Sequence, residues 1–226
     1  MTGVSVETEA VSSASRVHGK YGALEEFVWL KVEPLQTRYL AGSSAAAASL
    51  ARLRRAVGSE PGADPLVWEE TLEGFPRSLW GSDTKPSLEE RAAHAAIALY
   101  AVHQQSKSNQ RMHKRGVNIG RAAALLGIAI HGDDAVLRRF HALGTASSLD
   151  EAVNHARGLI SQFRSESIAL DYGRFAADLA RIQDPRYSDA VRLNWGRHYY
   201  FKPIDPAAKT QTDGGTTTVT PNGENK

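Results

Sequence analysis

The sequence predicts an all-α fold, and three observations support this prediction. Apolar residues recur at intervals of three and four along most of the chain, which is the spacing of one face of an α-helix. Serine, asparagine or aspartate residues suited to helix capping precede several of these runs. No Asn-Gly turn joins two stretches of alternating apolar and polar residues, so no β-hairpin is indicated.

The first half of the chain contains helices of different lengths. We expect long helices at residues 22–41 and 45–57, and shorter ones around 65–72 and 76–80. A further helix follows Pro86. Its start matches a capping box. In this motif the Ser87 side chain accepts from the backbone N–H of Glu90, and the Glu90 carboxylate accepts from the backbone N–H of Ser87. The apolar face behind this start consists of Leu88, Ala92, Ala95, Leu99 and Val102.

The second half is predicted to hold helices with equally clear starts. Two of them span about 118–130, with Asn118 as N-cap, and 134–143, closed by Gly144. The next three begin at a second capping box formed by Ser148 and Glu151, at Asp171, and at Asp184-Pro185, where the proline loses no hydrogen bond.

The polar stretch at 105–117 divides about nine helices into two groups. We therefore expect two small helical-bundle subdomains, one at 21–110 and one at 111–204. The small and polar residues 1–20 are predicted to form a flexible extension. Residues 205–226 are predicted to form a disordered tail, because they cannot bury enough apolar surface to offset the loss of chain entropy.

Composition excludes several classes of protein. The 226 residues are 42% hydrophobic and 23% charged, as in an ordinary soluble chain. The absence of cysteine excludes disulfides and cysteine metal sites. No apolar run approaches the ~20 residues of a membrane span, and the first residues lack the apolar core of a secretory signal. We expect a cytoplasmic protein that does not contact a membrane.

No catalytic motif is found in the sequence. It contains no Gly-x-Ser-x-Gly turn, no P-loop, no His-Glu-x-x-His motif and no two histidines at i and i+4. A helical metal-dependent phosphohydrolase using His131 and Asp133 is a conceivable alternative, but such a site needs further His and Asp ligands at helical positions. We therefore predict a protein that is not an enzyme and that uses neither a cofactor nor a metal.

The positive charges are distributed unevenly, although the formal net charge is only +2. No carboxylate lies between Glu90 and Asp133. The alternatives for this basic window are an anionic ligand or acidic residues from other segments that fold over it. The cations of the basic window are Arg91, Lys107, Arg111, Lys114, Arg115 and Arg121.

Residues 105–121 are the part of the basic window that most favours a phosphate-binding site. The segment reads as flexible and basic, and it leads into a helix whose first turn contains Gly120 and Arg121. A helix start with a glycine and an arginine can bind phosphate, because free backbone N–H groups and the guanidinium both attract an anion. The alternative is that Gly120 only permits a close helix crossing.

Three further pairs of arginines are predicted to lie on polar helix faces. For each pair the alternative is an ordinary solvated surface. Nothing in the sequence indicates recognition of bases, and the aromatic residues near the end of the last helix are interpreted as core. Any binding of nucleic acid should therefore involve the backbone, without sequence preference and with strong salt dependence. The three pairs are Arg54 and Arg55, Arg138 and Arg139, and Arg157 and Arg164; the aromatic residues are Trp195, Tyr199, Tyr200 and Phe201.

Several short segments, in matching order over about residues 24–201, resemble the CasB family, the small subunit of the type I-E CRISPR Cascade surveillance complex. Each segment alone is unspecific. The resemblance lies in Leu53-Arg54-Arg55-Ala56, His103-Gln104-Gln105-Ser106, Gly120-Arg121-Ala122, Leu137-Arg138-Arg139-Phe140, Asp184-Pro185 and Trp195-Gly196-Arg197.

This resemblance implies an all-α, non-catalytic protein made of two helical bundles. It implies a homodimer that packs against the Cascade backbone and large subunits, close to the guide RNA, in antiviral defence. A basic face would steady the DNA strands of the R-loop. The family tends to be basic at the positions of Arg54, Arg55, Arg121, Arg138 and Arg139, whereas Lys107, Lys114 and Arg115 are included on charge alone. A purely structural scaffold subunit, without nucleic-acid contact, is the alternative.

Overall fold

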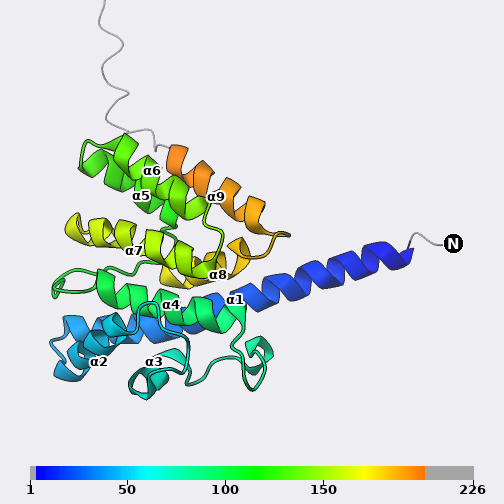
Figure 1. Ribbon diagram of the computed structural model, residues 1–226, viewed down its shortest axis with the longest axis horizontal. Helices are drawn as coiled ribbons and strands as arrows, with labels where there is room; N and C mark the ends of the chain where they lie inside the picture. The colour runs from blue at the N-terminus through cyan, green and yellow to red at the C-terminus, as the bar shows by residue number, and fades with distance from the viewer. Residues whose placement is uncertain (1–3, 202–226) are drawn as a thin grey trace, which may run out of the picture.

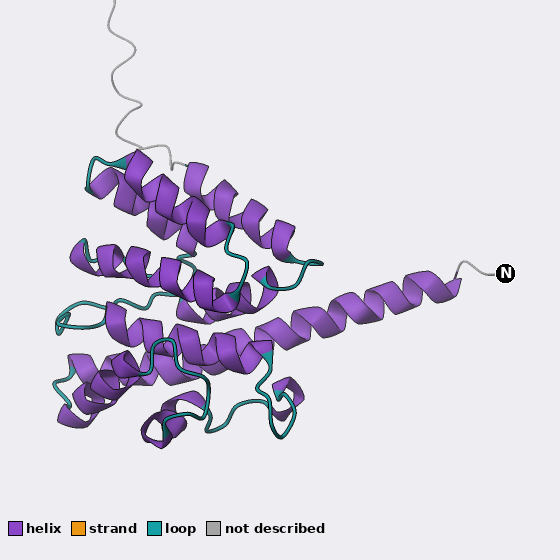
Figure 2. Ribbon diagram, in the orientation of Figure 1, coloured by secondary structure: helices purple, strands orange, loops and turns teal. Residues whose placement is uncertain are grey.

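The computed structural model describes the backbone of residues 4–201 and the side chains of residues 19–132 and 134–201. Within this range the chain forms nine α-helices, two short 3-10 helices and no strand, which confirms the predicted all-α class (Figure 2). The elements of the first half are α1 (Val4–Leu40), α2 (Ser44–Arg55), η1 (Pro65–Val67), α3 (Trp68–Thr71), η2 (Arg77–Leu79) and α4 (Leu88–His103). Those of the second half are α5 (Ile119–Ala129), α6 (Asp133–Gly144), α7 (Leu149–Ser165), α8 (Tyr172–Ile182) and α9 (Ser188–Tyr200).

Most predicted helix starts are confirmed by their capping hydrogen bonds. The Ser87 hydroxyl accepts from the amide of Glu90, and the Glu90 carboxylate accepts from the amide of Ser87, so the capping box is complete. Asn118 caps α5 and Asp171 caps α8 through the same type of contact. These caps depend only on residues three positions apart, which explains why the sequence reveals them.

Four local predictions need correction. The first helix begins at Val4, within the segment that we expected to be a flexible extension. Ser148 caps α7 as predicted, by accepting from the amide of Glu151, but the Glu151 carboxylate bonds Ser147, so the second half of the box does not form. Gly144 is the last residue of α6 and is not a left-handed cap after it. The last helix begins at Ser188 rather than at Asp184-Pro185, because Asp184 accepts hydrogen bonds from Arg186 and so caps a preceding turn. The tail at 205–226 lies outside the described residues.

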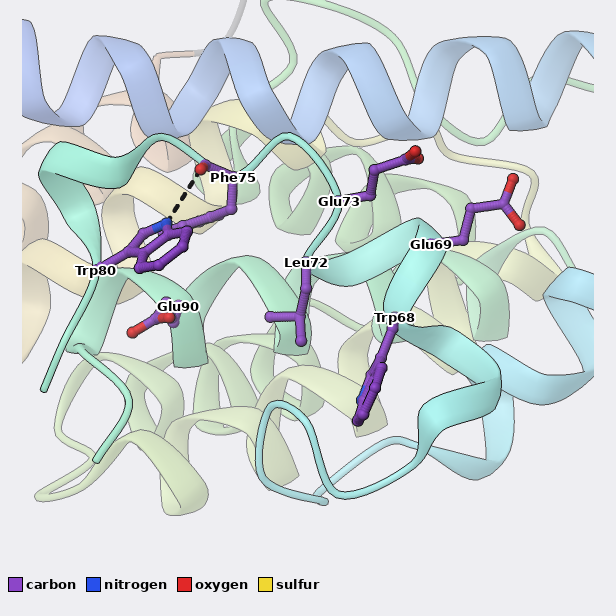
Figure 3. A pocket seen from close by; sticks show the side chains of 7 residues that line it. All are labelled: Trp68, Glu69, Leu72, Glu73, Phe75, Trp80 and Glu90. Atoms are coloured by element: carbon purple, nitrogen blue, oxygen red, sulfur yellow. Dashed lines mark hydrogen bonds between the residues drawn. The ribbon is translucent and has the colours of Figure 1, made fainter. Parts of the chain in front are cut away.

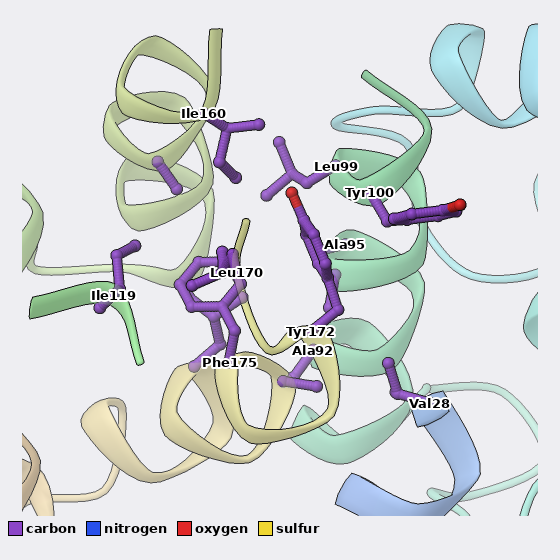
Figure 4. Close-up of a cluster of buried hydrophobic side chains, with 14 of the residues drawn as sticks. Val28, Ala92, Ala95, Leu99, Tyr100, Ile119, Ile160, Leu170, Tyr172 and Phe175 are labelled. Carbon is purple, nitrogen blue, oxygen red and sulfur yellow. The ribbon is translucent and has the colours of Figure 1, made fainter. Parts of the chain in front are cut away.

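The buried core is continuous from α1 to α9. Helix α4 lies in the middle, with α1, α2 and α3 on one side and α7 and α8 on the other (Figure 1). The side chains of Tyr100 on α4 and Tyr172 on α8 meet edge to face, with their ring centroids 5.4 Å apart (Figure 4). Helix α8 of the second predicted bundle thus packs against α1 and α4 of the first. The division into two bundles near residue 110 stays a prediction.

Candidate nucleic-acid interface

The basic segment after α4 is held in place by the buried side chain of Gln104. Its amide nitrogen donates to the carbonyl oxygens of Lys107 (2.5 Å) and Gln110 (2.8 Å). Its amide oxygen accepts from the backbone N–H of Met112 at 3.2 Å and from the hydroxyl of Tyr100 at 3.3 Å. Gln104 therefore holds the backbone of the loop at Lys107, Gln110 and Met112.

The second half of the same segment is bonded to α1 and to the start of α8. The Gln36 side chain accepts from the backbone N–H of His113 at 2.7 Å and donates to its carbonyl at 3.2 Å. The Asp171 carboxylate accepts from the N–H of Gly116 at 2.7 Å, and the Asp171 N–H donates to the carbonyl of Val117. These long-range bonds correct our expectation of a flexible segment, because they fix its backbone at several points.

Half of the cations in the basic window pair with carboxylates from distant parts of the chain. Arg91 contacts Glu60 and Asp150, at 2.9 and 3.0 Å. Arg111 contacts Glu33. Arg115 contacts Glu26 at 2.8 Å, and its guanidinium lies 4.0 Å from the centre of the Trp29 ring. For these three residues, acidic groups from other segments do cover the window.

Lys107 and Arg164 bring positive charge to the junction between the α4 loop and the end of α7. The Lys107 ammonium donates to the hydroxyl of Ser167 at 2.8 Å. The Arg164 guanidinium donates to the side-chain oxygen of Gln105 at 2.9 Å. Both partners are neutral, so the two positive charges remain available to an anion. Lys114 is exposed and has no side-chain partner among the described residues.

The start of α5 faces another helix rather than solvent. Gly120 is buried, and a Cβ added to it would lie 2.0 Å from the carbonyl oxygen of Trp195 on α9. The Asn118 side chain also donates to that of Asn194 on α9, at 3.0 Å. Gly120 therefore permits a close helix crossing, which was the alternative to a phosphate site. The Arg121 guanidinium is half-buried and donates to the carbonyl oxygen of Phe201 at 3.3 Å.

Four predicted arginines are exposed and have no side-chain partner in the described part of the chain. Arg138 and Arg139 lie side by side in sequence on α6, whose opposite side is buried through Val136 and Phe140. Arg157 on α7 and Arg55 on α2 are the other two, and Arg54 is half-buried without a partner. Helix α2 lies on the opposite side of α4 from α6 (Figure 1). The ten predicted residues therefore lie on elements on both sides of α4.

The aromatic residues at the end of α9 divide into two groups. Trp195 and Tyr199 are buried, as we expected of core residues. Tyr200 and Phe201 are exposed, which contradicts the interpretation of the whole cluster as core. Arg197, exposed on the same helix, was not among the predicted binding residues, although Trp195-Gly196-Arg197 is one of the segments that resemble the family. It lies three and four residues before these two aromatic residues, a spacing that places it near them.

An apolar pocket of about 500 Å³ lies between α3 and the start of α4. It is walled by Trp68, Leu72, Phe75 and Trp80, and its titratable lining residues are all acidic (Figure 3). Carboxylates repel phosphate, so this pocket does not extend the basic surface. The acidic lining residues are Glu69, Glu73 and Glu90.

The described side chains contain no group of three or more residues that could hold a metal ion. The side chain of Asp133, one of the two residues of the phosphohydrolase alternative, lies outside this description. Within the described range, no helix combines the length and the apolar character needed to cross a membrane.

Comparison with known proteins gives a consistent result. The family model of CRISPR-associated protein Cse2 matches residues 49–200. The crystal structure of CasB from Thermobifida fusca is 32% identical, with a TM-score of 0.66 over 78% of this chain and 97% of that one. CasB from M. ruber is 25% identical, with a TM-score of 0.54 over 75% and 92% of the two chains.

A chain of a CRISPR RNA-guided surveillance complex shares the fold, with 23% identity and a TM-score of 0.58 over 76% of this chain and 92% of that one. No curated protein matches the sequence significantly.

Proposed function

The chain belongs to the CRISPR-associated protein Cse2 family, which includes the CasB proteins, and from this premise we propose that it is a non-catalytic subunit of a type I-E Cascade complex. In this role it binds the backbone of the DNA strands opened in the R-loop, without sequence preference. Its partners are the Cascade backbone and large subunits, a second copy of itself and, through them, the guide RNA. It acts in the cytoplasm, in antiviral defence.

The observation that carries this proposal is the pair Arg138 and Arg139. Both side chains are exposed on α6, and no carboxylate among the described residues neutralises them. A guanidinium can donate two parallel hydrogen bonds to a phosphate. Opening of an R-loop is nearly balanced in free energy, so a few sequence-independent backbone contacts are enough to favour the open state.

Other arginines, which form ion pairs within the chain, favour a second candidate function. In this candidate the protein is a scaffold subunit that does not touch nucleic acid. Arg91, Arg111 and Arg115 have carboxylate partners within the chain, which shows that basic residues here also serve the fold. In this candidate role, Arg138 and Arg139 meet acidic groups of neighbouring subunits.

The test is fluorescence anisotropy of labelled single-stranded DNA, duplex DNA and RNA with the purified protein. The double variant Arg138→Glu, Arg139→Glu is compared with wild type between about 50 and 200 mM salt. We expect the double variant to bind with about one tenth of the wild-type affinity or less. The slope of its salt dependence should be reduced by about 0.7 per lost single-strand contact. The loss should be equal for oligonucleotides of unrelated sequence.

The matched control is Arg77→Glu, Lys85→Glu, which makes the same change of charge at two exposed residues away from α6. A specific interface requires this control to bind nearly as wild type does. If both double variants bind like wild type, Arg138 and Arg139 do not contact the strand. If the wild-type chain binds no nucleic acid even in dilute salt, the scaffold role is favoured.

A further inference from the structure

The last two turns of α9 expose an apolar and cationic stripe. Leu193, Tyr200 and Phe201 are 54%, 66% and 72% exposed. Arg197 is also exposed and lies between Leu193 and Tyr200 at helical spacings of four and three, so these side chains share one face. Phe201 directly follows the last residue of α9 as its C-cap. We call Arg197, Tyr200 and Phe201 the α9 stripe.

The helix that carries the α9 stripe is held from behind by aromatic packing. The ring of Tyr199 stacks on that of Phe140 in α6, with centroids 5.2 Å apart and an angle of 15° between the planes. The ring of Tyr200 meets that of Tyr199 edge to face, with their centroids 5.1 Å apart. The exposed ring of Tyr200 therefore rests on a packed support, and presenting it to a ligand costs little conformational entropy. The backbone carbonyl oxygen of Phe201 is held by the Arg121 guanidinium at 3.3 Å.

The surroundings of the α9 stripe are positively charged. The Arg121 guanidinium is bonded to the backbone of Phe201, and Phe140, which supports Tyr199, directly follows Arg139 on α6. None of Arg121, Arg139 and Arg197 pairs with a carboxylate among the described residues. Helices α5, α6 and α9 lie together at one end of the molecule (Figure 1).

This chemistry selects a planar ligand that carries negative charge. A basic peptide would be repelled by the arginines, and a phosphate alone would not use the rings. An unpaired nucleotide fits both features, because its base stacks on an aromatic ring while its phosphate faces the guanidinium groups. Stacking does not distinguish one base from another, in keeping with a sequence-independent protein.

We propose that the α9 stripe binds unpaired nucleobases of a single strand by stacking on Tyr200 and Phe201. This inference rests on the proposed strand-binding function, but it adds a contact of a different kind. Phosphate contacts made by Arg138 and Arg139 hold any polyanion, whereas the α9 stripe requires bases that are free of a partner strand. It therefore favours an opened strand over a duplex.

The test compares labelled oligothymidylate with an abasic oligonucleotide of equal length, which keeps the phosphates and lacks the bases. We expect the wild type to bind oligothymidylate about tenfold more tightly than the abasic strand. The double variant Tyr200→Leu, Phe201→Leu keeps apolar surface but removes both rings, so it should bind the two strands with equal affinity. Its salt slope should stay as in wild type, because no phosphate contact is lost.

A second double variant, Tyr200→Phe with Phe201→Tyr, keeps both rings and should retain the wild-type preference for oligothymidylate. Equal binding of the two strands by wild type, or an unchanged preference in the leucine variant, would overturn the proposal. The strand-binding function is judged separately, because Arg138→Glu with Arg139→Glu should lower the affinity for oligothymidylate and for the abasic strand by the same factor. Only a wild-type chain that binds neither strand contradicts both proposals.

Discussion

A Cβ added to Gly120 on α5 would lie 2.0 Å from the carbonyl oxygen of Trp195 on α9. The obstacle is backbone and not a flexible side chain, so a larger residue at position 120 must push the two helices apart.

Gly120→Ala should therefore destabilise the fold. We expect a loss of about 1–3 kcal/mol in the free energy of unfolding, as for other overpacked positions, measured by chemical denaturation. Gly158 on α7 is the control, because no atom lies within 4 Å of an added Cβ there. Gly158→Ala should raise stability by about 0.5–1 kcal/mol through its better helix propensity. Equal stability of the Gly120 variant and wild type would show that the crossing is loose.

Gln104→Ala should release the basic segment between α4 and α5. The substitution removes both hydrogen bonds from Gln104 to the carbonyls of Lys107 and Gln110, and leaves the N–H of Met112 without its acceptor. We expect faster tryptic cleavage after Lys107, and a stability loss of about 1–3 kcal/mol for the unsatisfied buried groups. Ser108→Ala, an exposed change in the same loop, should leave both quantities as in wild type.

Mild acid should destabilise the protein through His103. Its Nδ1 is 2.9 Å from the hydroxyl of Tyr172, and burial lowers the pKa of His103 to about 3. The unfolded chain takes up a proton near pH 6.5 that the folded chain does not, so the free energy of unfolding falls as pH falls from about 6.5 to 3. The loss at pH 5 from this group should be about 2 kcal/mol.

The measurement is urea denaturation of wild type and His103→Leu at about pH 7 and pH 5. The readout is the difference between the two pH values, which removes any constant cost of the substitution. Wild type should lose about 2 kcal/mol more than the variant on acidification. Burial also lowers the pKa of His94 and His113, so the variant should keep part of the dependence. The same loss in both proteins would exclude His103 as a source of acid sensitivity.

Asp178→Ala should destabilise the packing of α8 against α9. The Asp178 carboxylate is buried, and it accepts from the Trp195 indole N–H at 2.8 Å and from Arg181 at 3.0 Å. The substitution leaves the buried indole N–H without an acceptor, so we expect a loss of about 1–3 kcal/mol in thermal or chemical unfolding. Asp189→Ala, which breaks the exposed contact with Arg192, should cost less than about 1 kcal/mol.

Local features of the sequence were sufficient to locate most of the helices, although the first helix begins at Val4, well before its predicted start. Asn118 and Asp171 cap their helices through contacts with residues three positions ahead, and the complete capping box of Ser87 and Glu90 has the same range. The start of the last helix was predicted wrongly at Asp184, because Asp-Pro also suits a tight turn. A competing local structure, not a distant contact, explains this error.

The sequence by itself determined the helical class, most of the caps and the identity of the cations. Only the tertiary structure decided which cations are neutralised, because Glu26, Glu33 and Glu60 reach Arg115, Arg111 and Arg91 from segments distant in sequence. It likewise decided that Gly120 serves a helix crossing and that Tyr200 and Phe201 are exposed while Trp195 is buried. Helix formation depends on neighbours within one or two turns, whereas charge pairing and burial depend on which helices pack together.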